Sequence, residues 1–97
     1  MSSTFAAPAS PWTVVFTPPA LRSLDRLPAK VAAACVEFST ATLPSNPYRM
    51  SKPLVGDLEG YRSARRGEYR VVFELREEAR TLAVVRIAHR RDAYRGW

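Results

Sequence analysis

The sequence has little of what metal and redox sites need, because it holds one cysteine, Cys35, and one histidine, His89. A single cysteine excludes an internal disulfide, and one cysteine with one histidine cannot supply the three or four ligands of a zinc site. We therefore expect no metal and no cofactor. Cys35 stands among Val31, Ala34 and Phe38 at helical spacing, which is typical of a small core residue rather than a reactive thiol.

Long apolar runs are also absent. No stretch approaches the roughly 20 residues of a membrane-spanning helix, and the first residues lack the basic start and apolar stretch of a secretory signal. We expect a cytoplasmic protein without membrane contact. Residues 1–11 are mainly Ser, Ala and Pro, which cannot bury much surface, so we expect a disordered tail there and a single folded domain over residues 12–97.

Basic residues outnumber acidic ones, and arginine dominates them. The chain has 15 Lys and Arg against 9 Asp and Glu, a net charge of +6, and 13 of the basic residues are Arg. The planar guanidinium group matches phosphate oxygens bidentately, so this composition favours a polyanion as the partner. The cations are dense in residues 86–97, which hold four arginines, His89 and Tyr94 directly after an apolar run.

The apolar pattern predicts an α+β fold with an N-terminal strand, a two-helix hairpin and then three antiparallel strands. Thr17 can cap the first helix, since Pro18 and Pro19 fit its first turn. The expected elements are a strand over residues 12–16, helices over 17–27 and 28–42, a loop over 43–60, and strands over 61–66, 69–75 and 81–89. The first strand should join the sheet edge, with both helices on one face and the other face open.

Strand alternation indicates which arginines reach the open face, because neighbouring residues point to opposite sides. In the strand over 69–75, Tyr69, Val71 and Phe73 form the apolar side and leave Arg70 on the opposite side. The strand over 61–66 divides in the same way, with Arg62, Ala64 and Arg66 on one side and Tyr61, Ser63 and Arg65 on the other. In the strand over 81–89, the residues that share one side are Ala83, Val85, Ile87 and His89. That phase predicts His89 on the core side, unless the strand ends or bulges there.

Several side chains could carry chemistry, although each also has a plain explanation: Arg70 as a surface arginine, His89 as a histidine at a strand end and Tyr94 as a packing residue. If Arg62, Arg70 and Arg90 converge, they form a cationic cleft that binds a phosphate and stabilises added negative charge. Imidazole transfers protons near neutral pH, which makes His89 a candidate acid or base. Tyr94 offers a ring for stacking on an RNA base and a hydroxyl for hydrogen bonding.

Three segments together resemble the RelE branch of the RelE/ParE toxins of bacterial toxin–antitoxin pairs. They are Lys52-Pro-Leu-Val-Gly-Asp-Leu-Glu-Gly-Tyr61, Gly67-Glu-Tyr-Arg-Val-Val-Phe73 and Ile87-Ala-His-Arg-Arg-Asp-Ala-Tyr-Arg95. The resemblance implies an endoribonuclease, or mRNA interferase, that cuts mRNA in the ribosomal A site. The 2′-hydroxyl would attack the adjacent phosphate without a metal ion.

The resemblance also implies roles for individual residues. Arg70 would stabilise the phosphate, Arg90 would assist the leaving oxygen or the phosphate, and Tyr94 would stack on a base and orient the 2′-hydroxyl. Arg62 lies near a position where some members have a lysine that activates this hydroxyl, but a guanidinium group is a poor base. With His89 as a possible acid or base, the expected catalytic set is Arg62, Arg70, His89, Arg90 and Tyr94, and the expected RNA-binding set is Lys52, Arg65, Arg66, Arg91 and Arg95. Lys52 stands where other members have a glutamate.

The implied partners are a cognate antitoxin, the ribosome and mRNA. Because no segment has a helix-turn-helix pattern, we expect DNA contact only through the antitoxin. Two alternatives remain open. One is a ParE-like toxin that inhibits DNA gyrase and cleaves no RNA; the other is a non-catalytic basic module whose arginines only neutralise RNA phosphates.

Overall fold

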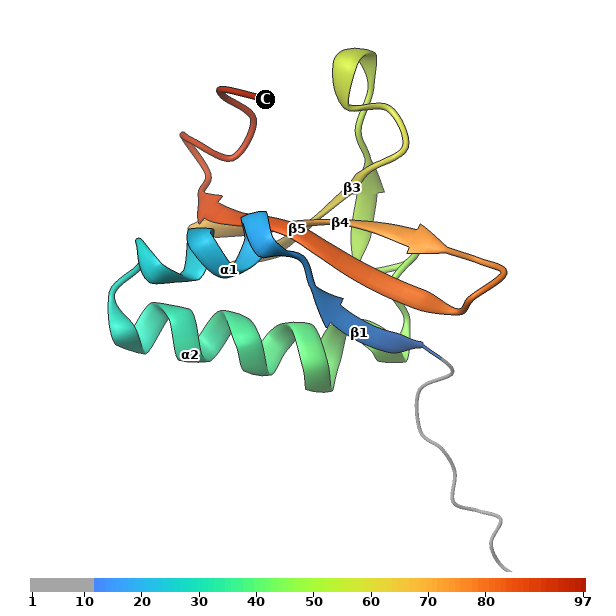
Figure 1. Ribbon diagram of the computed structural model, residues 1–97, viewed down its shortest axis with the longest axis horizontal. Helices are drawn as coiled ribbons and strands as arrows, with labels where there is room; N and C mark the ends of the chain where they lie inside the picture. Colours follow the sequence, from blue (N-terminus) through green and yellow to red (C-terminus); the bar gives the residue numbers. More distant parts are fainter. Residues whose placement is uncertain (1–11) are drawn as a thin grey trace, which may run out of the picture.

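The computed structural model describes residues 12–97, and it confirms the predicted α+β class (Figure 1). The elements are β1 (Thr13–Phe16), α1 (Pro18–Asp25), α2 (Ala29–Glu37), β2 (Ser51–Pro53), β3 (Arg62–Arg66), β4 (Tyr69–Arg76) and β5 (Thr81–His89). A π-helical turn over Phe38–Thr42 continues α2, and short 3-10 turns cover Leu43–Ser45 and Gly56–Leu58. The tail expected over residues 1–11 lies outside the described residues. Within residues 12–97, no helix is long and apolar enough to cross a bilayer.

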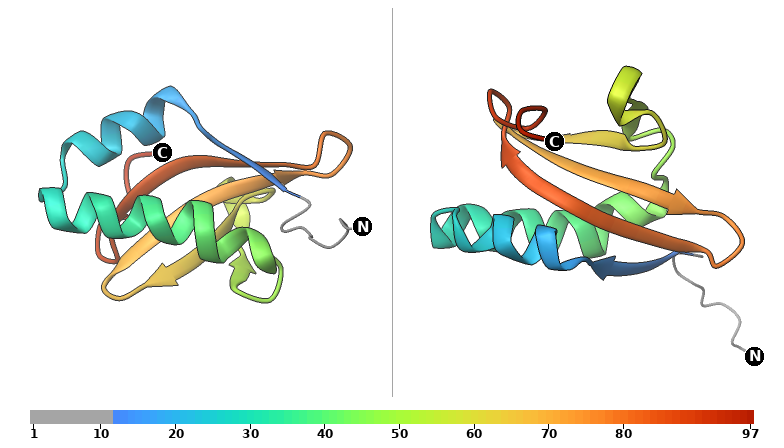
Figure 2. Two further views of the ribbon diagram at one scale, coloured as in Figure 1. Left: turned by 90° about the horizontal axis from the view of Figure 1, so that it is seen from below. Right: turned by 45° about the horizontal axis from the view of Figure 1, so that its top comes forward.

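The five strands form one mixed sheet in the order β1-β5-β4-β3-β2. β1 runs parallel to β5 at one edge, and the remaining neighbours are antiparallel. Both helices lie on one side of the sheet, while the C-terminal segment lies on the other side (Figures 1 and 2). The predicted position of the first strand at a sheet edge is therefore confirmed.

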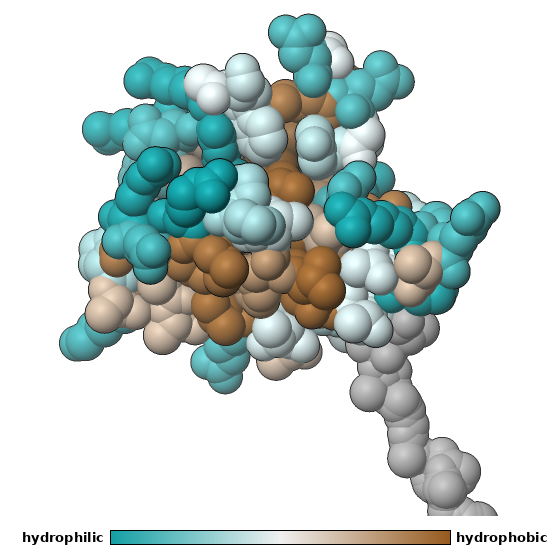
Figure 3. All heavy atoms as spheres, viewed as in Figure 1, coloured by the Kyte–Doolittle hydropathy of each residue, from teal (hydrophilic) through white to brown (hydrophobic). Residues whose placement is uncertain are grey.

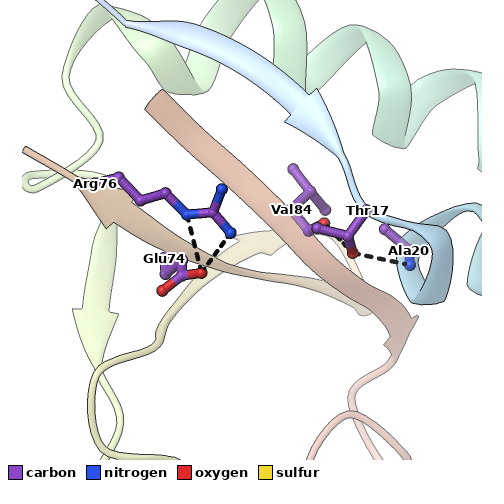
Figure 4. A network of polar contacts seen from close by, with 5 residues as sticks. All are labelled: Thr17, Ala20, Glu74, Arg76 and Val84. Atoms are coloured by element: carbon purple, nitrogen blue, oxygen red, sulfur yellow. Dashed lines mark hydrogen bonds and ion pairs between the residues drawn. The ribbon is translucent and has the colours of Figure 1, made fainter. Parts of the chain in front are cut away.

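Thr17 links the end of β1 to the start of α1, as its place before two prolines predicts. Its hydroxyl accepts a hydrogen bond from the Ala20 backbone N–H at 3.4 Å and donates one to the Val84 carbonyl at 2.9 Å (Figure 4). Pro18 and Pro19 occupy the first helical positions, where a backbone N–H has no partner within the helix. The same side chain thus caps α1 and ties it to β5.

The core fills the space between the helices and the sheet. Its buried members share one sheet face or the inner sides of the helices: Trp12, Ala20, Cys35, Leu43, Ala64, Val71, Phe73, Leu82, Val84 and Ile87. The apolar side predicted for β4 is confirmed, since Val71 and Phe73 are fully buried there. The opposite face of the central strands is consequently free of helices, and the site is built on it.

The structure adds a strand, β2, within the segment that we expected to be a loop. Ser51, Lys52 and Pro53 pair with Ala64, Ser63 and Arg62 of β3. Pro53 lacks a backbone N–H, which an edge strand tolerates because its outer side has no neighbour. Three residues are too few for alternation to be visible in a sequence, so only pairing with β3 defines this strand.

A bulge in β5 corrects the predicted phase of that strand. Val72 pairs with Arg86 while Phe73 pairs with Val84, which leaves Val85 without a partner on β4. The extra residue shifts the alternation by one position. Leu82 and Val84, rather than Ala83 and Val85, therefore share the core side with Ile87.

Candidate functional site

The open face of the sheet carries two rows of residues that the strand register brings together. One row runs through Lys52, Ser63, Val72 and Arg86, and the next runs through Arg65, Arg70 and Ala88. Paired residues on neighbouring strands share a face, so these side chains lie opposite the helix-covered core. The predicted placement of Arg70 on the open face is confirmed, and the arginine that joins it from β3 is Arg65, which pairs with it, rather than Arg62.

These rows border a hollow of about 560 Å³ with a strongly positive lining. Arg49, Lys52, Arg65 and Arg70 contribute four cations, Tyr94 contributes an aromatic ring, and no acidic side chain lines the hollow. Cations gathered in a concave site raise the local concentration of anions. We name this site, lined by those five residues and Ser63, the open-face hollow.

Tyr94 reaches the hollow from the C-terminal segment, outside the sheet. The Tyr94 and Ser63 hydroxyl groups lie 2.8 Å apart, at hydrogen-bond distance. Ala93 beside it is fully buried, although Tyr94 itself remains 45% exposed. The segment is therefore anchored next to Tyr94, while the tyrosine ring stays accessible to a ligand.

Arg86 holds this segment in place. Its Nη1 donates to the carbonyl oxygens of Ala93 and Arg95, and its Nη2 donates to the carbonyl of Gly96 at 3.4 Å. Its guanidinium carbon lies 4.2 Å from the ring centroid of Trp97, which is a cation–π contact. The Trp97 indole N–H in turn donates to the Ala93 carbonyl at 3.0 Å. Arg86 therefore closes the turn that carries Tyr94.

Arg70 and Arg90 each contact residues at the turn between β3 and β4. Arg70 Nη1 donates to the carbonyl oxygens of Gly67 and Tyr69, each at 3.1 Å. Arg90 Nε lies 3.0 Å from Glu68 Oε1, and both of these side chains are more than half exposed. An exposed pair of this kind adds little stability, so a phosphate can replace Glu68 as the partner of Arg90. Both guanidinium groups keep further donors for a ligand.

Arg62 does not join Arg70 and Arg90, so the expected convergence of these three residues is corrected. Arg62 pairs with Phe73 on the helix-covered side. Its Nε donates to the Ser51 hydroxyl at 2.7 Å, its Nη2 donates to the Tyr48 and Ser51 carbonyls at 3.3 Å, and it stacks on the Tyr48 ring. The Arg62 side chain thus fastens the β2 edge and its preceding turn.

Arg66 also lies on the helix-covered side, since it pairs with Tyr69. Burial raises the pKa of the Cys35 thiol above its ordinary value of 9.0, and the positive charge of Arg66 partly opposes this rise. Cys35 is only 1% exposed. A buried neutral thiol is a poor nucleophile, in agreement with the core position expected from the sequence.

His89 lies outside the open-face hollow. The bulge at Val85 returns Ile87 and His89 to the helix-covered side, where His89 pairs with Tyr69 at 5.4 Å between ring centroids. His89 and Arg95 line a second pocket, between the end of α1 and the C-terminal segment. The only imidazole is therefore not beside Arg70.

Of the other candidates, Arg91 is exposed, and its backbone N–H donates to His89 Nδ1 at 3.2 Å. The sequence analysis missed Ser63, Arg86 and Arg49. Arg86 interrupts an apolar strand just as Arg70 does, and this signal could have identified it. Ser63 and Arg49 carry no such signal, because only the register and the fold of the preceding turn bring them to the hollow.

Comparison with known proteins finds similarity over nearly all of the described residues. The family model "ParE toxin of type II toxin-antitoxin system, parDE" matches residues 14–94. The chain is 49% identical over 85 residues to Toxin RelE of Mycobacterium tuberculosis, covering 88% of each chain. It is 45% identical over 85 residues to Toxin RelG of the same organism, covering 88% of this chain and 98% of RelG.

Among solved structures, the chain is similar to the toxin–antitoxin complex RelBE2 from Mycobacterium tuberculosis. The TM-score is 0.78 at 43% identity, and the match covers 81% of this chain and 98% of the other. The two folds thus agree across most of the domain that carries the hollow.

Proposed function

The chain belongs to the RelE/ParE toxin superfamily as a RelE-family toxin of a type II toxin–antitoxin system, and from this premise we propose that it is a ribosome-dependent endoribonuclease. In this proposal it cleaves mRNA in the ribosomal A site without a metal ion or cofactor. The observation that carries the proposal is the open-face hollow, where four cations and Tyr94 meet with no acidic side chain in the lining.

The proposed reaction is an internal transfer within the RNA. The 2′-hydroxyl loses its proton as its oxygen forms a bond to the adjacent phosphorus, the bond from phosphorus to the 5′-oxygen breaks, and the leaving oxygen takes up a proton, so that no proton is gained or lost overall. The products are a 2′,3′-cyclic phosphate and a free 5′-hydroxyl. Negative charge accumulates on the phosphate oxygens in the transition state, so fixed cations lower the barrier.

The side chains divide this work by position. Arg70 binds the phosphate that reacts, and the charge around it is neutralised by Arg65 on β3 and Lys52 on β2. Arg90 reaches the same turn as Arg70 and stabilises the leaving oxygen once Glu68 is displaced. Tyr94 stacks on a base and holds the 2′-hydroxyl in line for attack, because its own hydroxyl is positioned by Ser63.

Proton transfer in this proposal does not use Arg62 or His89. Arg62 is committed to the Tyr48 and Ser51 contacts, and His89 lines the second pocket. The charged and aromatic side chains of the hollow are cations and one phenol, which suit charge stabilisation and hydrogen bonding. The proposed catalysis therefore rests mainly on electrostatic stabilisation and on orientation of the 2′-hydroxyl.

Cleavage of message on programmed ribosomes tests this function. Purified protein should produce RNA fragments that end in a cyclic phosphate, and Arg70→Ala should lower the cleavage rate by roughly a hundredfold or more. Arg76→Ala is the matched control, because Arg76 lies on the same strand but pairs with Glu74 away from the hollow (Figure 4). Intact message at every dose of wild-type protein would contradict the proposal.

A cognate antitoxin is the proposed protein partner. The 43% identical structure is a toxin–antitoxin complex, and the net charge of +6 favours an acidic partner. Adding the protein encoded next to this chain should suppress ribosomal cleavage in proportion to the complex formed. A neighbouring product that binds without any effect on cleavage would contradict this assignment.

A second candidate is inhibition of DNA gyrase, which the match to the ParE family model favours. In that case, the protein would block supercoiling of relaxed plasmid and leave programmed ribosomes intact. Running both assays on one preparation separates the two functions. We favour cleavage, because an inhibitor of gyrase does not require four cations and Tyr94 around one hollow.

A further inference from the structure

We propose that the second pocket, between α1 and the C-terminal segment, binds one nucleotide of single-stranded RNA. This inference deepens the proposed function and rests on its RNA substrate. The pocket has a volume of about 500 Å³ and is separate from the open-face hollow, with which it shares no lining residue.

Residues from three parts of the fold build this nucleotide pocket. Arg26 and Leu27 come from the corner between α1 and α2, Tyr69 and His89 from the paired strands β4 and β5, and Arg95 from the C-terminal segment. Residues that are distant in the sequence thus line one pocket, and they include basic, aromatic and aliphatic side chains.

The polar groups of the pocket are mainly donors. The Arg26 guanidinium makes no hydrogen bond or ion pair with another residue of the described range, and Arg95 lies 3.9 Å from its single carboxylate partner, Asp92. His89 Nδ1 accepts the Arg91 N–H, so a neutral ring carries its proton on Nε2 and donates from there. Two available guanidinium groups and one N–H donor suit a phosphate.

The apolar part of the pocket suits a nucleobase. Tyr69 and His89 are half-buried, edge-to-face rings, and Leu27 adds aliphatic surface beside them. Aromatic rings bind bases by stacking in a sequence-tolerant way. A carboxylate on a peptide would use the cations but not the rings, so the combination favours a nucleotide.

The C-terminal segment connects the two sites. Tyr94 lines the open-face hollow, whereas Asp92, Arg95 and Gly96 of the same turn line the nucleotide pocket. Figure 1 shows this segment leaving the end of β5 on the side of the sheet away from the helices. An RNA strand that crosses the turn can therefore contact both sites, with the reacting phosphate in the hollow and a flanking nucleotide in the pocket.

The imidazole signals of His89 provide the test, because this chain has one histidine and its ring resonances need no further assignment. The probe is a short single-stranded RNA with 2′-O-methyl sugars, which cannot undergo the proposed cleavage. Titration should shift the His89 ring protons as a stacked base adds its ring current, and the shift should saturate. Unmoved His89 signals at saturating RNA would overturn the proposal.

A pair of variants, one on α1 and one at its C-terminal cap, provides the matched comparison. Arg26→Ala removes a cation that lines the pocket, whereas Arg22→Ala removes one from the same helical region outside it. Arg26→Ala should weaken RNA binding about fivefold. The slope of the logarithm of the binding constant against the logarithm of salt concentration should become shallower by about 0.7, the value for one phosphate contact on a single strand. Arg22→Ala should change affinity less than twofold. Equal effects of the two variants would overturn the proposal.

Two further arms identify the ligand class. Duplex RNA of the same composition and a poly-glutamate peptide should both leave the His89 signals unchanged, and a saturable shift with either would assign the pocket to another ligand. The Arg70→Ala protein should still show the shift with single-stranded RNA. Binding at the pocket by a protein that cleaves no message would refute only the proposed function, while cleavage without a His89 shift would refute only this inference.

Discussion

Ser63 and Tyr94 join β3 to the C-terminal segment through hydroxyl groups that lie 2.8 Å apart. Ser63 is held by pairing with Lys52 on one side and with Val72 on the other. The tyrosine hydroxyl therefore has a position fixed by the sheet, although its ring belongs to a turn. This relationship explains how an exposed side chain near the chain end can act at a defined point in the hollow.

Tyr94→Phe should lower the rate constant of message cleavage by roughly a hundredfold, because it removes a positioned hydroxyl and keeps the ring. The concentration for half-maximal cleavage should change little, since stacking is retained. Ser63→Ala, which leaves the hydroxyl but removes its partner, should cost about fivefold, as expected for one hydrogen bond of about 1 kcal/mol. A full rate for Tyr94→Phe would exclude the hydroxyl from the reaction.

Arg86→Ala should release the turn that carries Tyr94. Amide hydrogens of residues 93–96 should exchange faster, and cleavage should fall mainly in its rate constant, because the lost contacts to the carbonyls and to Trp97 position Tyr94 rather than bind RNA. Arg86→Lys should not restore activity, since an ammonium group cannot make the same forked contacts. Removal of Trp97 should reproduce part of the loss. Normal exchange and normal cleavage in Arg86→Ala would contradict this role.

Lys52 allows charge to be separated from proton transfer. Lys52→Arg keeps the positive charge at the hollow and removes a readily titratable proton, whereas Lys52→Met removes both. We expect cleavage by Lys52→Arg within about threefold of wild type and a loss of at least about tenfold for Lys52→Met, because its proposed part is electrostatic. Equal loss in both variants would instead assign a proton-transfer step to Lys52.

Stability should depend on pH through Cys35. Burial raises the pKa of its thiol in the folded state above 9.0, so the unfolded chain ionises first as pH rises. The contribution of the buried neutral thiol to the free energy of unfolding is fully present below pH 9, and it is lost as pH rises through the folded-state pKa. Denaturant unfolding of wild type and Cys35→Ala from pH 7 to about 10 should therefore show a steeper decline above pH 9 for wild type. Parallel curves would contradict this contribution.

The surface of the protein follows the division between the two sheet faces. Hydrophilic side chains surround the C-terminal end and the loop before β3, whereas apolar surface gathers over α1 and β1 (Figure 3). Leu21 of α1 is 51% exposed. The cationic site and the apolar surface thus occupy different sides of the fold.

Local patterns predicted the elements that depend on near neighbours in the chain. Thr17 before two prolines identified the start of α1, and the alternation of Tyr69, Val71 and Phe73 identified the inner side of β4. Arg70 followed from the same alternation, because its neighbours Tyr69 and Val71 both face the helix-covered side. These predictions succeeded because a hydrogen bond within one turn or a period of two residues determines each of them.

Long-range pairing decided what those patterns could not. The side of Arg62 depends on its register with Phe73, the core positions of Leu82 and Val84 depend on the unpaired Val85, and β2 exists only through its bonds to β3. Each of these features is defined by a partner that is distant in the chain, and the alternation of residues within one strand does not reveal that partner. The prediction that three arginines converge was wrong for this reason.

Periodicity, composition and motifs are properties of the chain alone, and they were enough to predict the α+β class, the positive charge and the candidates Arg70 and Tyr94. Which of the candidates share a site followed from the folded arrangement. Strand register placed Lys52, Arg65 and Arg70 on one face and His89 on the other, and Arg86 anchored the segment that delivers Tyr94. Which side chains lie next to one another depends on contacts between distant segments, and the sequence of one segment does not specify those contacts.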